Sequence, residues 1–139
     1  MSNGTAANPQ HAALMNIAEK YRKVVMDRTK NWSITDIAEL VKGSLSPDKS
    51  GRAISEVITA MVDAEERLYD LSIIKMEARN LLTTMDDPSL MVAKKEFRRV
   101  LDLASDGVVI AKNRYEHLQT VLGGIRSINT NMRSAKVNG

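Results

Sequence analysis

Residues 54–85, ISEVITAMVDAEERLYDLSIIKMEARNLLTTM, decide the fold. Apolar side chains recur here at intervals of three and four residues, which is the spacing of one face of an α-helix. A seven-residue frame that starts at Ile54 has apolar residues at nine of its ten core positions. Those positions are Ile54, Val57, Met61, Ala64, Leu68, Leu71, Lys75, Ala78, Leu82 and Met85. The frame predicts a long amphipathic helix over about residues 52–85.

The residues that follow, Asp86–Asp87–Pro88–Ser89, predict a turn. Proline disfavours the helical conformation for the residue before it, so the first helix should end ahead of Pro88. The same proline can open a new helix, with Asp87 as the N-cap.

A second frame begins at Leu90 and continues to the end of the chain. Its core positions are Leu90, Ala93, Phe97, Val100, Ala104, Gly107, Ala111, Arg114, Leu118, Val121, Ile125, Ile128, Met132 and Ala135. The frame keeps its phase across Gly107, which favours a helix that continues through this glycine. Gly123–Gly124 is the more plausible break, because glycine costs about 1 kcal/mol relative to alanine inside a helix. The sequence leaves the choice between these two positions open.

The charges of the two helices are complementary. Residues 51–87 carry four basic and eight acidic side chains, a net charge of −4, whereas residues 88–139 carry nine basic and four acidic ones, a net charge of +5. Two long helices joined by a short turn pack side by side in opposite directions. We therefore expect an antiparallel, coiled-coil-like helical hairpin over residues 52–135.

The remaining segments are shorter. We expect a flexible leader over residues 1–8, two N-terminal helices within residues 9–43, a linker over residues 44–51 and a flexible tail over residues 136–139. The fold class predicted is therefore all-α, with two N-terminal helices and a long antiparallel helical hairpin.

Composition narrows the function classes. The 139 residues include no cysteine and 4% aromatic residues, and the net charge is +3. These numbers exclude disulfides and thiolate metal sites and disfavour an aromatic-rich sheet. His11 and His117 are not accompanied by a catalytic pattern, so we expect a non-enzymatic protein with no cofactor, no metal site and no membrane-spanning segment. A cytoplasmic location and export without a cleavable signal peptide are both compatible with the sequence.

The longer second helix predicts an assembly surface. In the expected hairpin, Ile125, Ile128 and Met132 extend past Ile54 and need another apolar partner. We expect them to meet the two N-terminal helices, the first of which carries Ile17 and Tyr21, or a second copy of the protein. The function favoured by this pattern is assembly or partner binding through helix–helix contacts, with itself or with other helical proteins.

Two further groups of residues stand out. Lys94, Lys95, Arg98 and Arg99 form a basic patch, which supports an alternative function in binding nucleic acid or another polyanion. Lys75 and Arg114 interrupt the two apolar frames. They either extend to the edge of the hairpin or fix its register and choice of partner.

The segment Asp86–Asp87–Pro88–Ser89–Leu90–Met91 resembles the acidic, proline-containing turn ahead of the last helix in some inner-rod proteins of bacterial type III secretion systems. Related subunits at the base of the flagellar rod are also short, free of cysteine and poor in aromatic residues. The resemblance covers at most residues 52–135. It implies a self-assembling structural subunit of a secretion apparatus.

Overall fold

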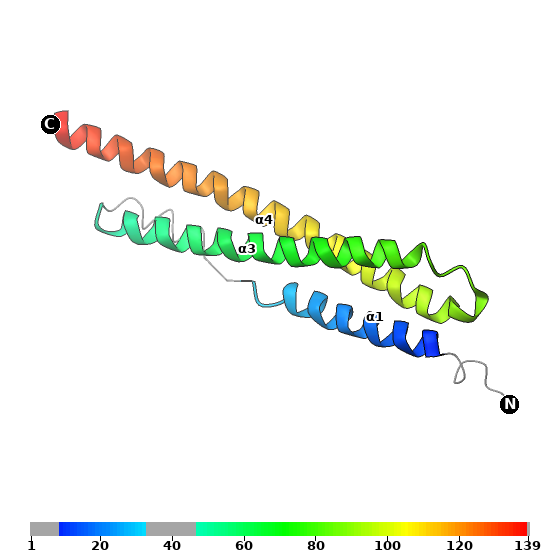
Figure 1. Cartoon of the computed structure of the whole chain (residues 1–139). Coiled ribbons are helices and arrows are strands. Elements are labelled where there is room, and N and C mark those ends of the chain that lie inside the picture. The colour runs from blue at the N-terminus through cyan, green and yellow to red at the C-terminus, as the bar shows by residue number, and fades with distance from the viewer. Residues whose placement is uncertain (1–8, 33–46, 139) are drawn as a thin grey trace. The chain divides into compact units, whose positions relative to one another are not determined.

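The protein is all-α in the residues that its structure, a computed structural model, describes. These are residues 9–32 and 47–138, with side chains for 9–32, 51–128 and 130–131. They form helices α1 (Pro9–Arg28), α3 (Pro47–Leu82) and α4 (Met91–Asn138), and a 3-10 turn η1 (Pro88–Leu90) (Figure 1). This described part contains no β-strand. Residues 33–43, the last part of the segment expected to form two N-terminal helices, and the leader over residues 1–8 lie outside it.

The chain divides into two compact units. The first contains residues 1–30 and 67–110, and the second contains residues 31–66 and 111–139. Each unit therefore includes part of α3 and part of α4.

The core of the first unit joins three helices. Helix α1 lies alongside α3 and α4 in this unit (Figure 1) and contributes buried side chains to the same apolar cluster. The members of the cluster are Leu14, Ala18, Val25, Leu71, Ile74, Ala78, Met85, Leu90, Ala93, Phe97, Val100 and Ala104. Six of them form what we call the seam, where α3 and α4 meet. The seam residues of this unit are Leu71, Ala78, Met85, Leu90, Phe97 and Ala104, and each is at most 2% exposed.

The second unit has its own apolar cluster. Ala53, Val57 and Ala60 of α3 pack there with residues of α4. The α4 members are Leu118, Leu122 and Ile125. Alanine at two of the three α3 positions lets the larger side chains of α4 approach the α3 backbone closely, as in other interdigitated helix pairs.

The predicted cap at the turn is confirmed. Asp87 is the N-cap of η1, with Pro88 at the first position of that turn. The backbone N–H of Ser89 donates to Asp87 Oδ1 at 2.9 Å. This hydrogen bond holds the pKa of the Asp87 carboxyl below its usual value.

The limits of α3 differ from those expected. The helix begins at Pro47, so residues 47–51 belong to it and not to a linker. Proline is favoured in the first turn of a helix, where its missing N–H has no partner to lose. At the other end α3 stops at Leu82, and the amides of Thr83 and Thr84 donate to the carbonyls of Asn80 and Leu81 in a tightened last turn.

The buried face of α3 is turned by one residue from the predicted frame. Ala53, Ala60 and Ile74 are buried, whereas Ile54 and Lys75 are only half-buried. The companion positions of the frame, from Val57 to Met85, are all buried as predicted. Alanine is only weakly apolar, so Ala53 and Ala60 were not recognised as core residues. The frame was instead placed on their larger neighbours Ile54 and Met61, which are half-buried.

The buried face of α4 is the predicted one as far as Ala111, whereas beyond it Val121 of the frame is half-buried and Leu122, outside the frame, is buried. Every position of the frame from Leu90 to Ala111 is buried. The helix passes through both Gly107 and Gly123–Gly124 without a break and continues to Asn138, so the expected tail is helical up to that residue. The prediction of a break at Gly123–Gly124 is therefore wrong. Leu122 and Ile125, on either side of these glycines, are buried against α3 and hold the helix together.

Gly107 is tightly packed and Gly123 is not, so substitution by alanine should change the stability in opposite directions at these two positions of α4. A Cβ atom at Gly107 would lie 2.9 Å from both Leu71 Cδ1 and Thr29 Cγ2, whereas a Cβ at Gly123 would meet no atom within 4 Å. Overpacking a buried site costs about 1–3 kcal/mol, which exceeds the gain of about 1 kcal/mol in helix propensity. We expect Gly107→Ala to lower the free energy of unfolding by about 1 kcal/mol and Gly123→Ala to raise it by up to about 1 kcal/mol.

Urea denaturation followed by circular dichroism measures both changes, and Gly123→Ala serves as the matched control. Equal stabilisation by the two substitutions would show that Gly107 is not tightly packed against α1 and α3.

Candidate interaction surfaces

Helix α1 covers one side of the seam, which we call the α1 side. Arg28 Nε forms an ion pair with Asp70 Oδ2 at 2.9 Å, and the Tyr21 hydroxyl donates to Glu77 Oε2. The Tyr21 ring also packs edge-on against Phe97, with ring centroids 6.2 Å apart. The acidic side chains of α3 therefore face a helix of opposite net charge, because α1 carries four basic and two acidic side chains.

Arg67 of α3 caps the C-terminal end of α1. Its Nη1 donates to the carbonyl oxygens of Arg28 and Lys30, at 3.3 Å and 2.6 Å. Carbonyls at the end of a helix have no partner within the helix, and a guanidinium supplies one and also complements the helix dipole. Sequence reasoning missed this role because the frame that starts at Ile54 placed Leu68, and not Arg67, in the core. A frame that starts at Ala53 includes Arg67.

The opposite side of the seam, which we call the open side, carries no other described element of the first unit. Successive residues of an α-helix are about 100° apart, so a residue one position before a seam residue and a residue four positions after it point to opposite sides. Asp70, Glu77 and Glu96 precede seam residues and belong to the α1 side. The half-buried residues four positions after a seam residue belong to the open side. They are Lys75, Leu82, Lys94, Leu101 and Val108.

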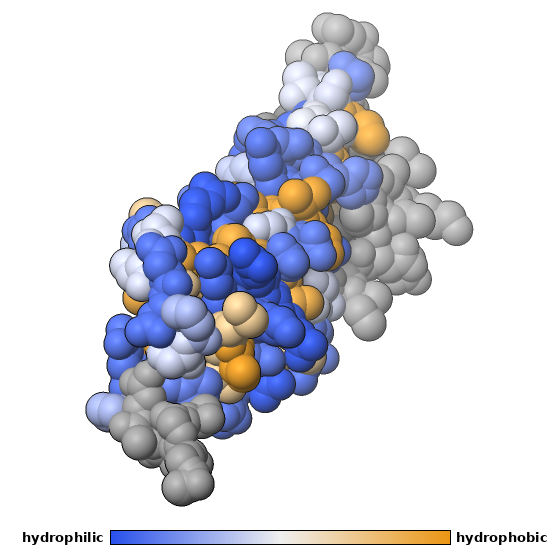
Figure 2. Space-filling view, turned by 90° about the vertical axis from the view of Figure 1, so that its right-hand side faces the viewer, coloured by the Kyte–Doolittle hydropathy of each residue, from blue (hydrophilic) through white to orange (hydrophobic). Residues whose placement is uncertain are grey.

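A third surface is the outer face of α3. Tyr69 and Met76 each lie two residues before a seam residue, which places them almost opposite the seam. They are 67% and 56% exposed, and the half-buried Ile73 lies between them in the sequence. We call these three residues the outer stripe. On the face of the molecule seen in Figure 2, apolar side chains appear as small separate patches among hydrophilic ones.

The predicted assembly residues are divided between buried and half-buried positions. Ile125 is 1% exposed and packs within the second unit, so it does not extend past α3 as expected. Ala53 and Val57 of α3 belong to the same apolar cluster, and α3 continues beyond them to Pro47, so this part of α4 has a partner helix. Ile128 is half-buried, and the side chain of Met132 lies outside the described part.

The other two predicted assembly residues lie in the first unit. Ile17 and Tyr21 are half-buried and pack against the core cluster of that unit. The contacts of Tyr21 with Glu77 and Phe97 are made within the chain. Both residues therefore serve the docking of α1.

The structure divides the predicted basic patch between two faces of α4. Lys94 follows the seam residue Leu90 by four positions and Arg98 directly follows Phe97, so both belong to the open side and its edge. Lys95 and Arg99 are exposed and turn to the outer surface of α4. Arg99 forms an ion pair of 3.9 Å with Glu96.

The two residues that interrupt the predicted frames lie in different units. Lys75 is half-buried on the open side of the first unit. Arg114 is half-buried in the second unit, where its guanidinium lies 5.7 Å from the centre of the Trp32 ring in a cation–π arrangement. Trp32 is thus one of the contacts of Arg114. The role of both residues in register or partner choice stays a prediction.

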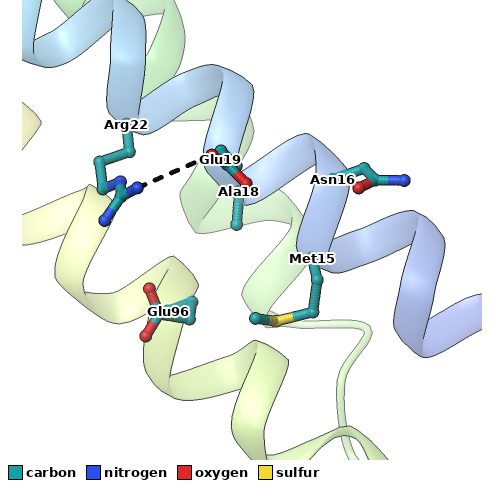
Figure 3. A pocket seen from close by; sticks show the side chains of 6 residues that line it. All are labelled: Met15, Asn16, Ala18, Glu19, Arg22 and Glu96. Atoms are coloured by element: carbon teal, nitrogen blue, oxygen red, sulfur yellow. Dashed lines mark ion pairs between the residues drawn. The ribbon is translucent and has the colours of Figure 1, made fainter. Parts of the chain in front are cut away.

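A small pocket lies between α1 and α4 in the first unit (Figure 3). Its volume is about 210 Å³, and Met15, Asn16, Ala18, Glu19, Arg22 and Glu96 line it. Arg22 forms an ion pair with Glu19 of its own helix at 3.9 Å, and the carboxylate of Glu96 faces the pocket from α4. The pocket is smaller than sites that enclose a small-molecule ligand, which measure about 300–1,000 Å³.

The described residues also bear on metal binding and membrane insertion. Within these ranges no group of three or more His, Cys, Asp or Glu side chains is arranged to hold a metal ion. None of the described helices is long and apolar enough to cross a membrane. His11 is half-buried and His117 is exposed.

The contact between Tyr21 and Glu77 predicts a loss of stability in alkali. Burial, the hydrogen bond to Glu77 and the charge of Glu77 together raise the pKa of Tyr21 from 10.0 to about 12. Because the folded value is the higher one, the neutral phenol stabilises the fold below pH 10, and this contribution is lost as the pH rises from 10.0 to about 12.

We expect the absorbance titration of the wild-type protein minus that of Tyr21→Phe to have its midpoint at about pH 12. We also expect Tyr21→Phe to lose less of its unfolding free energy than the wild type does over this pH range. A difference titration centred at pH 10 would contradict the docking of Tyr21 on Glu77.

Comparisons with protein-family models, with curated proteins and with solved structures found no match to this chain.

Proposed function

We propose that this protein is a non-enzymatic structural protein that assembles with copies of itself through the outer stripe of α3. The observation that carries the proposal is the exposure of Tyr69 and Met76, with Ile73 between them, on a helix face turned away from the core. In this proposal α3 and α4 form an antiparallel, coiled-coil-like hairpin that holds the stripe straight and accessible.

The spacing of the stripe supports a helical partner. Tyr69, Ile73 and Met76 follow the i, i+4, i+7 pattern by which one helix packs against another. Val62 and Ile58, which are 49% and 40% exposed in the second unit, lie seven and eleven residues before Tyr69 in the sequence of α3, with Glu65 and Glu66 at the intervening positions. Single exposed apolar residues are common, but a row at helical spacing is typical of an interaction face.

A finer version of the proposal is a structural subunit of a bacterial secretion apparatus. Its support is the resemblance of residues 86–91 to the turn of inner-rod proteins, together with the Asp87 cap and the long helices on either side. The partners would then be copies of this chain or other helical proteins.

A second candidate function is the binding of nucleic acid or another polyanion. The exposed residues Lys95, Arg98 and Arg99 support it, because phosphates need only a positively charged surface. Binding to phosphates would not explain the exposed apolar side chains of the outer stripe, whereas assembly would bury them. For this reason we favour assembly.

The assembly proposal predicts how the mass in solution changes with substitution. We expect the wild type to form oligomers of the 15.4 kDa chain at high concentration, and Tyr69→Lys plus Met76→Lys to remain monomeric. Burial of two such side chains contributes about 3 kcal/mol, which corresponds to a weakening of about 100-fold. Size-exclusion chromatography with light scattering measures the mass.

The matched control is Val109→Lys plus Ile110→Lys. These residues of α4 are 57% and 50% exposed, so the control makes the same change in charge at a similarly exposed place. It should assemble like the wild type. A wild type that stays monomeric at every concentration, or equal loss of assembly in both variants, would overturn the role of the outer stripe.

A further inference from the structure

The open side of the first unit combines an apolar strip with positive charge. Leu82, Leu101 and Val108 pack against the core cluster but are only partly covered by it. Leu68, half-buried and fourteen residues before Leu82, extends the strip along α3. At 1.5 Å per residue this distance is about 21 Å, or about four turns of a helix lying along it.

Four cations accompany this strip. Lys75 lies within it, seven residues from both Leu68 and Leu82, and Lys94 lies at its end, seven residues before Leu101. Arg79 and Arg98, each one residue after a seam residue, lie along its outer edges. None of the four forms an ion pair with another residue in the described part of the chain. Lys75 and Lys94 are half-buried, so their stems cover apolar surface while their ammonium groups reach the edge.

The acidic residues of the unit lie elsewhere. Asp70, Glu77 and Glu96 are on the α1 side. Asp102 and Asp106 are exposed on the outer surface of α4, and Asp102 is one turn beyond Arg98. The two sides of the seam therefore differ in charge. The α1 side carries three carboxylates and one cation, Arg67, which bonds to the end of α1, whereas the open side carries cations.

The α1 side shows how such a surface is covered in this fold. There a basic amphipathic helix buries Leu14, Ala18 and Val25 against the seam and places Arg28 on Asp70. The open side has the same two components, an apolar strip and charged edges, with the charge reversed. A helix that covers it in the same way needs apolar residues at helical spacing and carboxylates on either side.

We propose that the open side of the first unit docks an acidic amphipathic helix of a partner protein. The leucines and valine of the strip take the apolar face of that helix, and its Asp and Glu side chains pair with Lys75, Arg79, Lys94 and Arg98. Charge complementarity sets the orientation and the rate of association, and apolar burial supplies most of the affinity. This surface differs from the outer stripe, so the inference goes beyond the proposed function and does not depend on it.

Polyanion binding fits this side less well. Stacking on bases requires exposed aromatic rings, and Phe97, which lies nearest to the cations in the sequence, is fully buried. Phosphates would also leave the leucines of the strip uncovered.

A synthetic peptide tests the proposal on the full-length chain. The peptide is a fluorescein-labelled helix of about five turns, with leucine at i, i+3, i+4 and i+7 and glutamate on both flanks. We expect fluorescence anisotropy to show binding that weakens with salt. A scrambled peptide of the same composition should bind at least about tenfold more weakly, because it has no apolar face.

Two pairs of neighbouring cations provide matched variants. Lys94→Glu plus Arg98→Glu reverses the charge on the open side and should weaken binding by about tenfold or more, whereas Lys95→Glu plus Arg99→Glu on the outer surface should change it by less than about twofold. Circular dichroism verifies that both variants fold. In the wild type, the methyl signals of Leu82, Leu101 and Val108 should shift when the peptide is added, which gives a readout without any substitution.

Three results would overturn the inference. They are failure of the amphipathic peptide to bind, equal binding of the scrambled peptide, and equal losses from the two charge-reversal pairs. Tighter binding of duplex DNA than of the peptide, reduced by both pairs alike, would assign the cations to a polyanion site instead. Because these outcomes are read as peptide binding and the assembly test is read as mass, either proposal can fail alone.

Discussion

The close contact of α3 with α4 at the seam determines where every other side chain of the first unit points. Leu71, Ala78 and Phe97 are fully buried there, and small residues at alternate positions let the two helices approach. Gly107 shows how little space remains, since even one added carbon atom would collide with Leu71 and Thr29. Once the seam is fixed, the 3.6-residue repeat assigns each remaining residue of α3 and α4 to the α1 side, the open side or the outer surface.

This assignment separates charges that are mixed in the sequence. The carboxylates of Asp70 and Glu77 meet α1, where Arg28 and the Tyr21 hydroxyl are their partners. The cations of Lys75 and Lys94 are on the other side. In a partly exposed site such pairs contribute modestly to stability, about 0–1 kcal/mol each, but they discriminate well between partners of opposite charge. The charges on the two sides therefore affect the choice of the helix that docks on each side more than they affect the stability of the unit.

Much of this arrangement follows from the sequence, and the exceptions have physical causes. The α4 frame was predicted correctly as far as Ala111 because large residues such as Leu90 and Phe97 mark its buried face. The Asp87 cap was predicted because proline restricts the residue before it. The α3 frame was one residue off because its buried face uses alanine at 53 and 60. Because of that error the role of Arg67 was missed. Its hydrogen bonds to the end of α1 form only when α1 packs against α3. The break expected at Gly123–Gly124 failed because burial of Leu122 and Ile125 outweighs helix propensity. The open side could not be predicted before the side occupied by α1 was known.

The placement on which the two sides of the seam depend is that of α1, which occupies the acidic side and leaves the basic side open. Nuclear Overhauser effects between side-chain protons of the full-length protein test it most directly. We expect cross-peaks from the Tyr21 ring to the Phe97 ring, whose centroids are 6.2 Å apart, and none from α1 to the methyl groups of Leu101 or Val108. Cross-peaks from α1 to Leu101 or Val108, with none to Phe97, would place α1 on the other side and contradict the account.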